Sequence, residues 1–196
     1  METPPVDGSG KTVGRKIVYD CGFLSVEQDP ESGFYLVRTT NAAAILVYVP
    51  KLDAVVMIEQ ERVALVKAEN PTGISNEVPA GRFDRDTDLV SLLQSELEEE
   101  AGIRLGRDAI KILNGGIPLS LAPGVLTERA YLAYAEAEPE DIDFTKAQFG
   151  VKAENEKILR RLVPVAELPG MKFDNIAAWG LVNWFLAERT KGGTGQ

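Results

Sequence analysis

Alternating and continuous apolar runs divide the first third of the chain into strands. Residues 15–28 and 33–39 have β-like patterning, with the turn sequence DPESG between them. AAAILVYV at 42–49 and AVVMIEQERVAL at 54–65 are runs rich in β-formers on either side of the turn sequence PKLD. We therefore expect a small antiparallel sheet followed by the strands of a core.

After the turn sequence NEVPAG the period changes to that of a helix. Leucines at helical spacing predict a helix from about Thr87 to Ala101, which Gly102 ends. Further elements are predicted downstream: strands around 109–120, 129–137 and 157–164, an acidic loop at 138–156, and a closing amphipathic helix at 175–189. Strands with interspersed helices indicate an α/β (α+β) fold, an α/β/α sandwich.

Length and composition limit the class of protein. A chain of 196 residues with 44% hydrophobic content fits one globular domain with a sizeable core. Residues 1–14 and 190–196 are rich in Pro, Gly and small polar residues, so we expect a disordered N-terminus and a flexible tail. No run of about 18 apolar residues exists to span a bilayer, and METPPVDGSGK lacks the apolar stretch of a signal peptide. We expect a soluble, cytoplasmic protein.

The residue inventory narrows the chemistry. The chain has no histidine, which excludes Ser-His-Asp and Cys-His triads, histidine-ligated zinc and imidazole bases. The lone Cys21 cannot form an internal disulfide, which fits a reducing cytosol, and we expect a small buried residue there. A formal charge of −9 argues against nonspecific binding to nucleic acid or anionic membranes. Catalysis must use carboxylates, lysines, hydroxyls or a hard metal ion.

Four carboxylates crowd the end of the predicted helix, in the stretch SELEEEAG. Glu96, Glu99 and Glu100 are spaced i, i+3, i+4 and share one helix face. Glu98 points elsewhere. At about 5 Å and an effective dielectric of about 20, each pair on that face repels by ~3 kcal/mol. A bound divalent cation would reverse the sign of this interaction. Magnesium and manganese suit the site because both ions prefer oxygen ligands. A solvated acidic face is the alternative.

The flanks of the cluster complete a motif. GRFDRDTDLVSLLQSELEEEAGI, residues 81–103, resembles the Nudix box, G-x5-E-x7-R-E-U-x-E-E-x-G-U with U apolar. The positions that match in register are Gly81, Glu96, Leu97, Glu99, Glu100, Gly102 and Ile103. Thr87 stands where the box has its first glutamate, and Ser95 where it has an arginine. In that family the arginine helps to orient the helix carboxylates, so its loss bears on rate more than on metal binding.

Similarity extends beyond the box, over roughly residues 19–189. AVVMIEQERVAL, NEVPAG, LSLAPGVLTERAYLAYAEA, AENEKI and KFDNIAAWGLVNWFL occur in the order and approximate spacing of the ADP-ribose pyrophosphatase branch of Nudix hydrolases. The resemblance implies a Nudix α/β/α sandwich over 41–189, preceded by an N-terminal antiparallel β-sheet at 15–40. It also implies metal-dependent hydrolysis of the diphosphate bond of a nucleoside diphosphate sugar, with ADP-ribose giving AMP and ribose 5-phosphate.

The resemblance also assigns metal and catalytic residues by position. Glu96 and Glu100 would be the main ligands of Mg²⁺ or Mn²⁺, with Glu99 as an additional ligand or second catalytic carboxylate and Ala80 binding through its carbonyl. In the AENEKI segment, Glu154 would be the general base and Glu156 an auxiliary metal ligand, because a carboxylate committed to metal is a weak proton acceptor. An ordinary solvated loop is the alternative for that segment.

Four further residues match substrate-binding positions of this branch. Arg62 would reach the diphosphate, unless it is a surface arginine paired with Glu59 or Glu61. Glu77 would accept from the adenine amino group; a solvated glutamate on an edge strand is the alternative. Phe23 would stack on adenine in the partner subunit's site, and a core phenylalanine is the other interpretation. Glu128, in APGVLTERA, would support the distal sugar or the metals.

Several alternatives stay open at the level of sequence. The branch forms homodimers by exchanging the N-terminal sheet, whereas a monomer would pack residues 15–40 on its own sheet. The substrate could instead be UDP- or ADP-glucose or GDP-mannose. Thr87 and Ser95 also leave room for a catalytically weak Nudix-like nucleotide-binding or regulatory module. A self-repelling carboxylate cluster argues against that module, since binding alone gains nothing from it.

Overall fold

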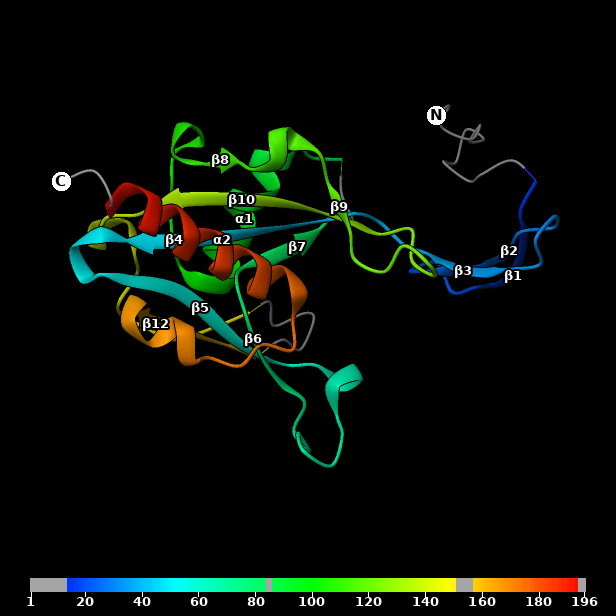
Figure 1. Ribbon diagram of the computed structural model, residues 1–196, viewed down its shortest axis with the longest axis horizontal. Coiled ribbons are helices and arrows are strands. Elements are labelled where there is room, and N and C mark those ends of the chain that lie inside the picture. The colour runs from blue at the N-terminus through cyan, green and yellow to red at the C-terminus, as the bar shows by residue number, and fades with distance from the viewer. Residues whose placement is uncertain (1–13, 84–85, 151–156, 194–196) are drawn as a thin grey trace. The chain divides into compact units, whose positions relative to one another are not determined.

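The computed structural model describes residues 14–83, 86–150 and 157–193. The chain divides into two compact units. The smaller unit comprises Met1–Asn41 and Ser120–Arg129, and the larger comprises Ala42–Leu119 and Ala130–Gln196. Each unit has its own sheet, so each is described by itself (Figure 1).

The smaller unit contains an antiparallel meander in the order β1-β2-β3. Its strands are β1 (Lys16–Asp20), β2 (Ser25–Gln28) and β3 (Tyr35–Arg38). The segment around Leu126 runs beside β3, where the Val37 N–H donates to the Val125 carbonyl at 2.7 Å. The Glu27 carboxylate accepts two bonds from the Arg38 guanidinium, which ties β2 to β3. The predicted small antiparallel sheet is therefore present.

The predicted β region 15–28 is interrupted by a turn. Gly22 adopts φ 81°, and its N–H donates to the Asp20 carboxylate at 2.8 Å, so the chain reverses between β1 and β2. Cys21 lies in this turn and is exposed. The expectation that Cys21 is buried was therefore wrong, because a turn presents its side chains to solvent.

The larger unit is built on a nine-stranded sheet with the central order β11-β12-β5-β4-β10-β8. Its strands are β4 (Ala42–Val49), β5 (Ala54–Glu61), β6 (Ile74–Glu77), β7 (Ala80–Arg82), β8 (Lys111–Ile112), β9 (Leu119–Ser120), β10 (Arg129–Glu136), β11 (Gln148–Phe149) and β12 (Ile158–Pro164). β4 pairs in parallel with β10, whereas it pairs antiparallel with β5. The short 3-10 segments are Pro50–Leu52, Val63–Leu65, Arg107–Ala109, Asn114–Gly116, Pro139–Asp141 and Val165–Gly170.

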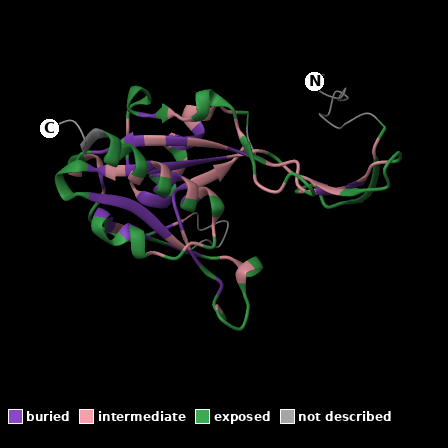
Figure 2. Ribbon diagram, viewed as in Figure 1, coloured by how far each residue is buried: buried purple, intermediate pink, exposed green. Residues whose placement is uncertain are grey.

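Two helices cover opposite faces of this sheet, α1 (Leu89–Ala101) and α2 (Ile176–Gly193). Alternate residues of β4 explain the arrangement: Ile45 packs with the α1 side chains, and Leu46 packs with those of α2. β4 and β5 are accordingly buried along most of their length (Figure 2). The predicted mixed α+β architecture with helices on both faces is confirmed.

Both ends of α1 are capped, and its end at Gly102 is the predicted one, whereas it begins two residues after the predicted start at Thr87. The Asp88 carboxylate accepts from the N–H groups of Val90 and Ser91 at 3.1 and 3.2 Å, so the helix begins at Leu89. Hydrogen bonds from Arg107 and Ser91 hold the pKa of Asp88 far below its ordinary value. At the other end Gly102 takes a left-handed conformation with φ 62°.

Two downstream elements differ from their predictions. The expected strand around 109–120 is reduced to β8 and β9, because Asn114, Gly115 and Gly116 all have positive φ and break the extended backbone. The closing helix α2 continues to Gly193 instead of ending at residue 189. Across the described ranges, no helix is both long and apolar enough to cross a membrane.

Gly102→Ala is expected to destabilise the larger unit by about 2–4 kcal/mol, from left-handed strain plus overpacking. A Cβ there would lie 2.4 Å from Cε1 of Phe149. Gly106→Ala is the matched control, because Gly106 has φ −66° and a Cβ there would meet nothing within 4 Å. Urea unfolding followed by circular dichroism measures both variants, and equal midpoints for the two would contradict this account of Gly102.

Candidate functional site

A split in the large sheet positions the candidate site. β4 and β5 pair with each other only through Val47–Val49 and Ala54–Val56, and then they diverge. β6 pairs with β5 and β7 pairs with β4, so the segment NEVPAG crosses from one diverging strand to the other. The Ile45 N–H donates to the Pro79 carbonyl at 3.0 Å and fixes this crossing. The backbone of Ala80 and Gly81 therefore lies on the α1 side of the split, where α1 packs on β7.

Two carboxylates of α1 meet this backbone. The Glu100 side chain is 5% exposed, and its Oε2 accepts from the Ala80 N–H at 2.8 Å. The Glu96 carboxylate lies so close to Gly81 that a Cβ on that glycine would be 1.8 Å from Oε1. A side chain at position 81 would therefore force the Glu96 carboxylate to move. The structure brings Glu96, Glu100 and the Ala80–Gly81 backbone together at one place.

The other two helix glutamates are more exposed than this pair. Glu98 is exposed and accepts two bonds from Arg104, at 2.5 and 2.8 Å. Glu99 is also exposed, and its backbone carbonyl accepts from the Gly150 N–H at 3.1 Å. The predicted base Glu154 and ligand Glu156 lie outside the described residues. Within those described ranges, no three His, Cys, Asp or Glu side chains are grouped to hold a metal ion.

The donor set nevertheless fits one kind of ion. Mg²⁺ is usually held by one or two carboxylates, with water and substrate phosphate oxygens completing its six ligands. Glu96 and Glu100 supply two hard oxygen donors, and a buried carboxylate such as Glu100 is most stable beside a cation. These residues fit Mg²⁺ or Mn²⁺ bound jointly with a diphosphate better than a metal that needs a complete protein cage.

Arg62, which follows β5, and Glu77, the last residue of β6, form a bidentate pair. Arg62 Nε donates to Glu77 Oε1 at 2.9 Å, and Nη2 donates to Oε2 at 2.7 Å. Glu77 is 3% exposed, so the alternative of a solvated edge glutamate was wrong. Glu59, one of the proposed surface partners of Arg62, instead accepts from Arg161. The pair holds a cation and an anion side by side, and their predicted contacts with substrate stay predictions.

The remaining predicted substrate residues, Phe23 and Glu128, belong to the smaller unit. Phe23 is 67% exposed in the turn between β1 and β2, so the interpretation as a core phenylalanine was wrong. Glu128 is partly buried in the segment that follows the bridge at Leu126. Their predicted roles stay predictions.

Arg160 on β12 is a residue that we did not select from the sequence. Its guanidinium is buried and donates to the Ala101 carbonyl at the end of α1. Burial lowers its pKa from the ordinary value, yet an arginine remains charged at neutral pH. The signal was present in KILRRLVPV: strand alternation puts Arg160 on the same face as Ile158 and Leu162, both apolar.

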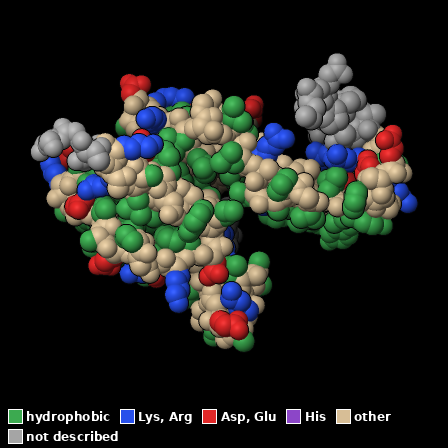
Figure 3. Space-filling view, viewed as in Figure 1, with side chains coloured by type: hydrophobic (Ala, Val, Ile, Leu, Met, Phe, Trp, Pro, Cys, Tyr) green, Lys and Arg blue, Asp and Glu red, His purple; other side chains and the backbone are tan. Residues whose placement is uncertain are grey.

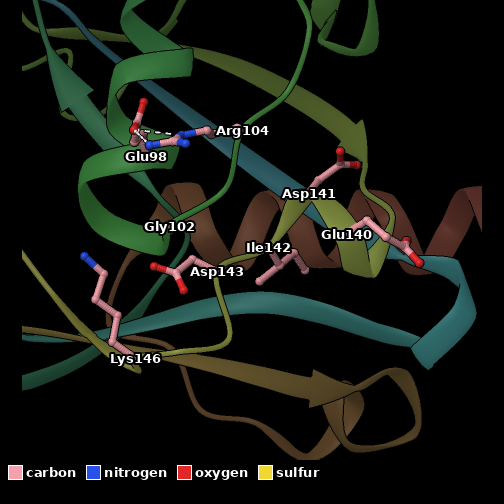
Figure 4. Close-up of a pocket in the computed structure, with 8 residues that line it drawn as sticks. All are labelled: Glu98, Gly102, Arg104, Glu140, Asp141, Ile142, Asp143 and Lys146. Carbon is pink, nitrogen blue, oxygen red and sulfur yellow. Dashed lines mark hydrogen bonds and ion pairs between the residues drawn. The ribbon is translucent and has the colours of Figure 1, made fainter.

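A surface pocket of about 340 Å³ lies beyond the end of α1 (Figure 4). It is lined by Glu98, Gly102, Arg104, Glu140, Asp141, Ile142, Asp143 and Lys146. Its carboxylates already have partners: Glu98 pairs with Arg104, and Asp143 accepts from the backbone and hydroxyl of Thr145. The pocket contains neither Glu96 nor Glu100, so it is separate from the candidate site.

Comparison with known proteins gives one informative similarity. No family model matches the chain. The chain is 35% identical over 121 residues to the GDP-mannose pyrophosphatase of Enterobacter sp. (strain 638). This match covers 56% of the chain and 60% of the relative, so the chain spans less than two thirds of that relative's length. The similarity agrees in kind with the diphosphate chemistry that the helix carboxylates suggest.

Proposed function

We propose that the chain is a metal-dependent pyrophosphatase that hydrolyses the diphosphate bond of a nucleoside diphosphate sugar. The observation that carries the proposal is the approach of two α1 carboxylates, Glu96 and Glu100, to the Ala80–Gly81 backbone. Repelling carboxylates held together beside a backbone turn are stabilised by a bound cation. The similarity to a pyrophosphatase supports the same class of reaction.

The chain's own residues would divide the work by position. Glu96 and Glu100 would hold Mg²⁺ or Mn²⁺, which when bound neutralises diphosphate charge and activates water. Arg62 carries a positive charge at the end of β5, in a protein whose formal charge is −9. An anionic substrate requires such a local cation, and the Glu77 carboxylate holds the guanidinium plane in a fixed orientation.

We propose Glu154 as the general base, with Glu99 and Glu128 as the carboxylates to examine next. The support is chemical, because a base separate from the metal ligands keeps its lone pairs and its proton affinity. Glu156 would add a ligand to the metal. These assignments rest on the order of the AENEKI segment after the box.

The proposed substrates are all nucleoside diphosphate sugars. Cleavage of the P–O–P link yields a nucleoside monophosphate and a sugar phosphate, so GDP-mannose would give GMP and mannose 1-phosphate. The relative's name favours GDP-mannose, whereas the motif order resembles ADP-ribose pyrophosphatases. We place GDP-mannose and ADP-ribose first, followed by UDP- and ADP-glucose.

We also propose a homodimer that uses the smaller unit. Large apolar side chains are exposed on its strands and turns: Ile17, Val18, Tyr19, Phe23, Phe34 and Tyr35. Hydrophobic atoms are visible along the β1–β3 strands in Figure 3. An exposed apolar patch of this kind is typical of a protein interface, and a second copy of the chain carries the same patch.

With magnesium, the wild-type chain is expected to release phosphatase-sensitive product from at least one sugar nucleotide of this panel, and EDTA should abolish release.

Glu100→Gln is expected to lower kcat at least ~10²-fold and to remove the magnesium-induced rise in Tm, because it loses one ligand charge. Glu98→Gln is the matched control, since Glu98 pairs with Arg104 away from the site. Inactivity with every substrate and metal would instead favour a binding module.

Glu154→Gln is expected to lower kcat ~10²-fold or more on the best substrate, the usual contribution of a general base, while KM changes little. Steady-state kinetics at several magnesium concentrations measure both parameters. Glu140→Gln, on an exposed part of the preceding acidic loop, is the control. Wild-type kcat in Glu154→Gln would move the base assignment to Glu99 or Glu128.

Sedimentation is expected to show a dimer for the wild-type chain and a monomer for the double variant Phe34→Glu/Tyr35→Glu. Both side chains are exposed, at 73% and 56%, so the charges should disturb association more than folding. Ile117→Glu, at an exposed position of the larger unit, is the control and should stay dimeric. A monomeric wild-type chain at micromolar concentration would argue against the homodimer.

A further inference from the structure

Arg160 is a buried cation at the C-terminal end of the helix that carries the candidate metal ligands. It lies on β12 in register with Ile58, and its side chain is 7% exposed. Its neighbour Arg161 points to the other face, is exposed, and pairs with Glu59. Two adjacent arginines of one strand therefore have different environments, and only Arg160 faces α1.

The Arg160 guanidinium donates hydrogen bonds to three main-chain carbonyls. Nη1 donates to the Ala101 carbonyl at 2.6 Å, and Nη2 donates to the carbonyls of Asp143 and Lys146 at 2.8 and 3.0 Å. Its planar group also lies 4.8 Å from the ring centroid of Phe149. Three carbonyls and an aromatic ring hold the guanidinium in one orientation, and it in turn holds the end of α1 against β12.

The end of α1 needs a cation more than most helix ends do. A helix terminus exposes carbonyl groups with a partial negative charge, and here acidic side chains crowd the same turn. The N–H of Gly150 bonds the Glu99 carbonyl, and Arg160 bonds that of Ala101. Gly102 makes the approach possible, because a Cβ there would lie 3.3 Å from Arg160 Nη1 and closer still to Phe149.

The family that the box resembles carries an arginine on this helix, at the position of Ser95. Ser95 is exposed and supplies no charge. We infer that Arg160 is the positioning residue of this chain, which sets the last turn of α1, and with it Glu96 and Glu100, against the Ala80–Gly81 backbone. The inference rests on the proposed function for its catalytic consequence. Misplacement of such ligands by about 1 Å costs up to ~10²-fold in rate.

Three variants test the inference. Arg160→Met keeps most of the side-chain volume but removes the charge and all three hydrogen bonds. Arg160→Lys keeps the charge but loses the planar fork. Arg161→Met is the matched control, one residue away on the exposed face. All measurements are made well below each variant's unfolding midpoint, so that every sample is folded.

Arg160→Met is expected to weaken Mn²⁺ binding about tenfold, as measured by electron paramagnetic resonance. It should also lower kcat ~10²-fold and leave KM for the sugar nucleotide within about threefold of the wild-type value. Arg160→Lys should be intermediate in both quantities, and Arg161→Met should stay within about twofold of wild type. If Arg160→Met does not fold, the Mn²⁺ affinity and kcat of Arg160→Lys are compared with those of wild type to test the inference. A folded Arg160 variant with lower Tm but wild-type Mn²⁺ affinity and kcat would overturn the inference.

The Mn²⁺ measurement separates this inference from the proposed function. If the wild-type chain binds Mn²⁺ but hydrolyses no sugar nucleotide, the proposed function fails and the affinities of the Arg160 variants still test the positioning role. If wild type is active and the Arg160 variants equal it in both readouts, the inference alone fails.

Discussion

Negative charge at the C-terminal end of α1 is the constraint on which the rest of the larger unit depends. Three glutamates on one helix face repel one another, and the helix dipole adds to that repulsion. Two hydrogen-bond donors from other elements compensate this negative charge: the Ala80 N–H donates to the Glu100 carboxylate, and Arg160 donates to the Ala101 carbonyl. The helix is therefore held at its acidic end by β7, the strand that precedes it in the chain, and by β12, which is remote from it in sequence.

The sheet is shaped to supply those donors. Because β4 is buried on both faces, it fixes the positions of α1 and α2 at once. Where β4 and β5 diverge, the crossing from β6 to β7 brings a main-chain N–H and a glycine to the helix. Only a residue without a Cβ allows Glu96 to approach so closely. The same crossing begins at Glu77, whose bond to Arg62 keeps a cation beside the split.

The two units carry different parts of the proposed activity. The residues proposed to contact metal and diphosphate, Glu96, Glu100 and Arg62, belong to the larger unit. Phe23 and Glu128, which the resemblance associates with the adenine ring and the distal sugar, belong to the smaller unit. Glu77, which the resemblance associates with adenine, belongs to the larger unit as well. Diphosphate chemistry depends on a few hard donors, whereas choosing between guanine and adenine requires further contacts with the base ring.

The sequence alone determined the features that depend on near neighbours. The helix that ends at Ala101 before Gly102 and the core strands β4 and β5 follow from local periodicity and end signals. Tertiary structure decided what depends on remote pairing and burial. The bond between Arg160 and Ala101 spans 59 residues, and the sequence showed only an arginine at an inward strand position. For Glu77 the sequence left a solvated edge glutamate open as an alternative, and strand pairing buried the residue beside Arg62. Whether a charge is buried, and what compensates it, depends on elements that meet only when the chain has folded.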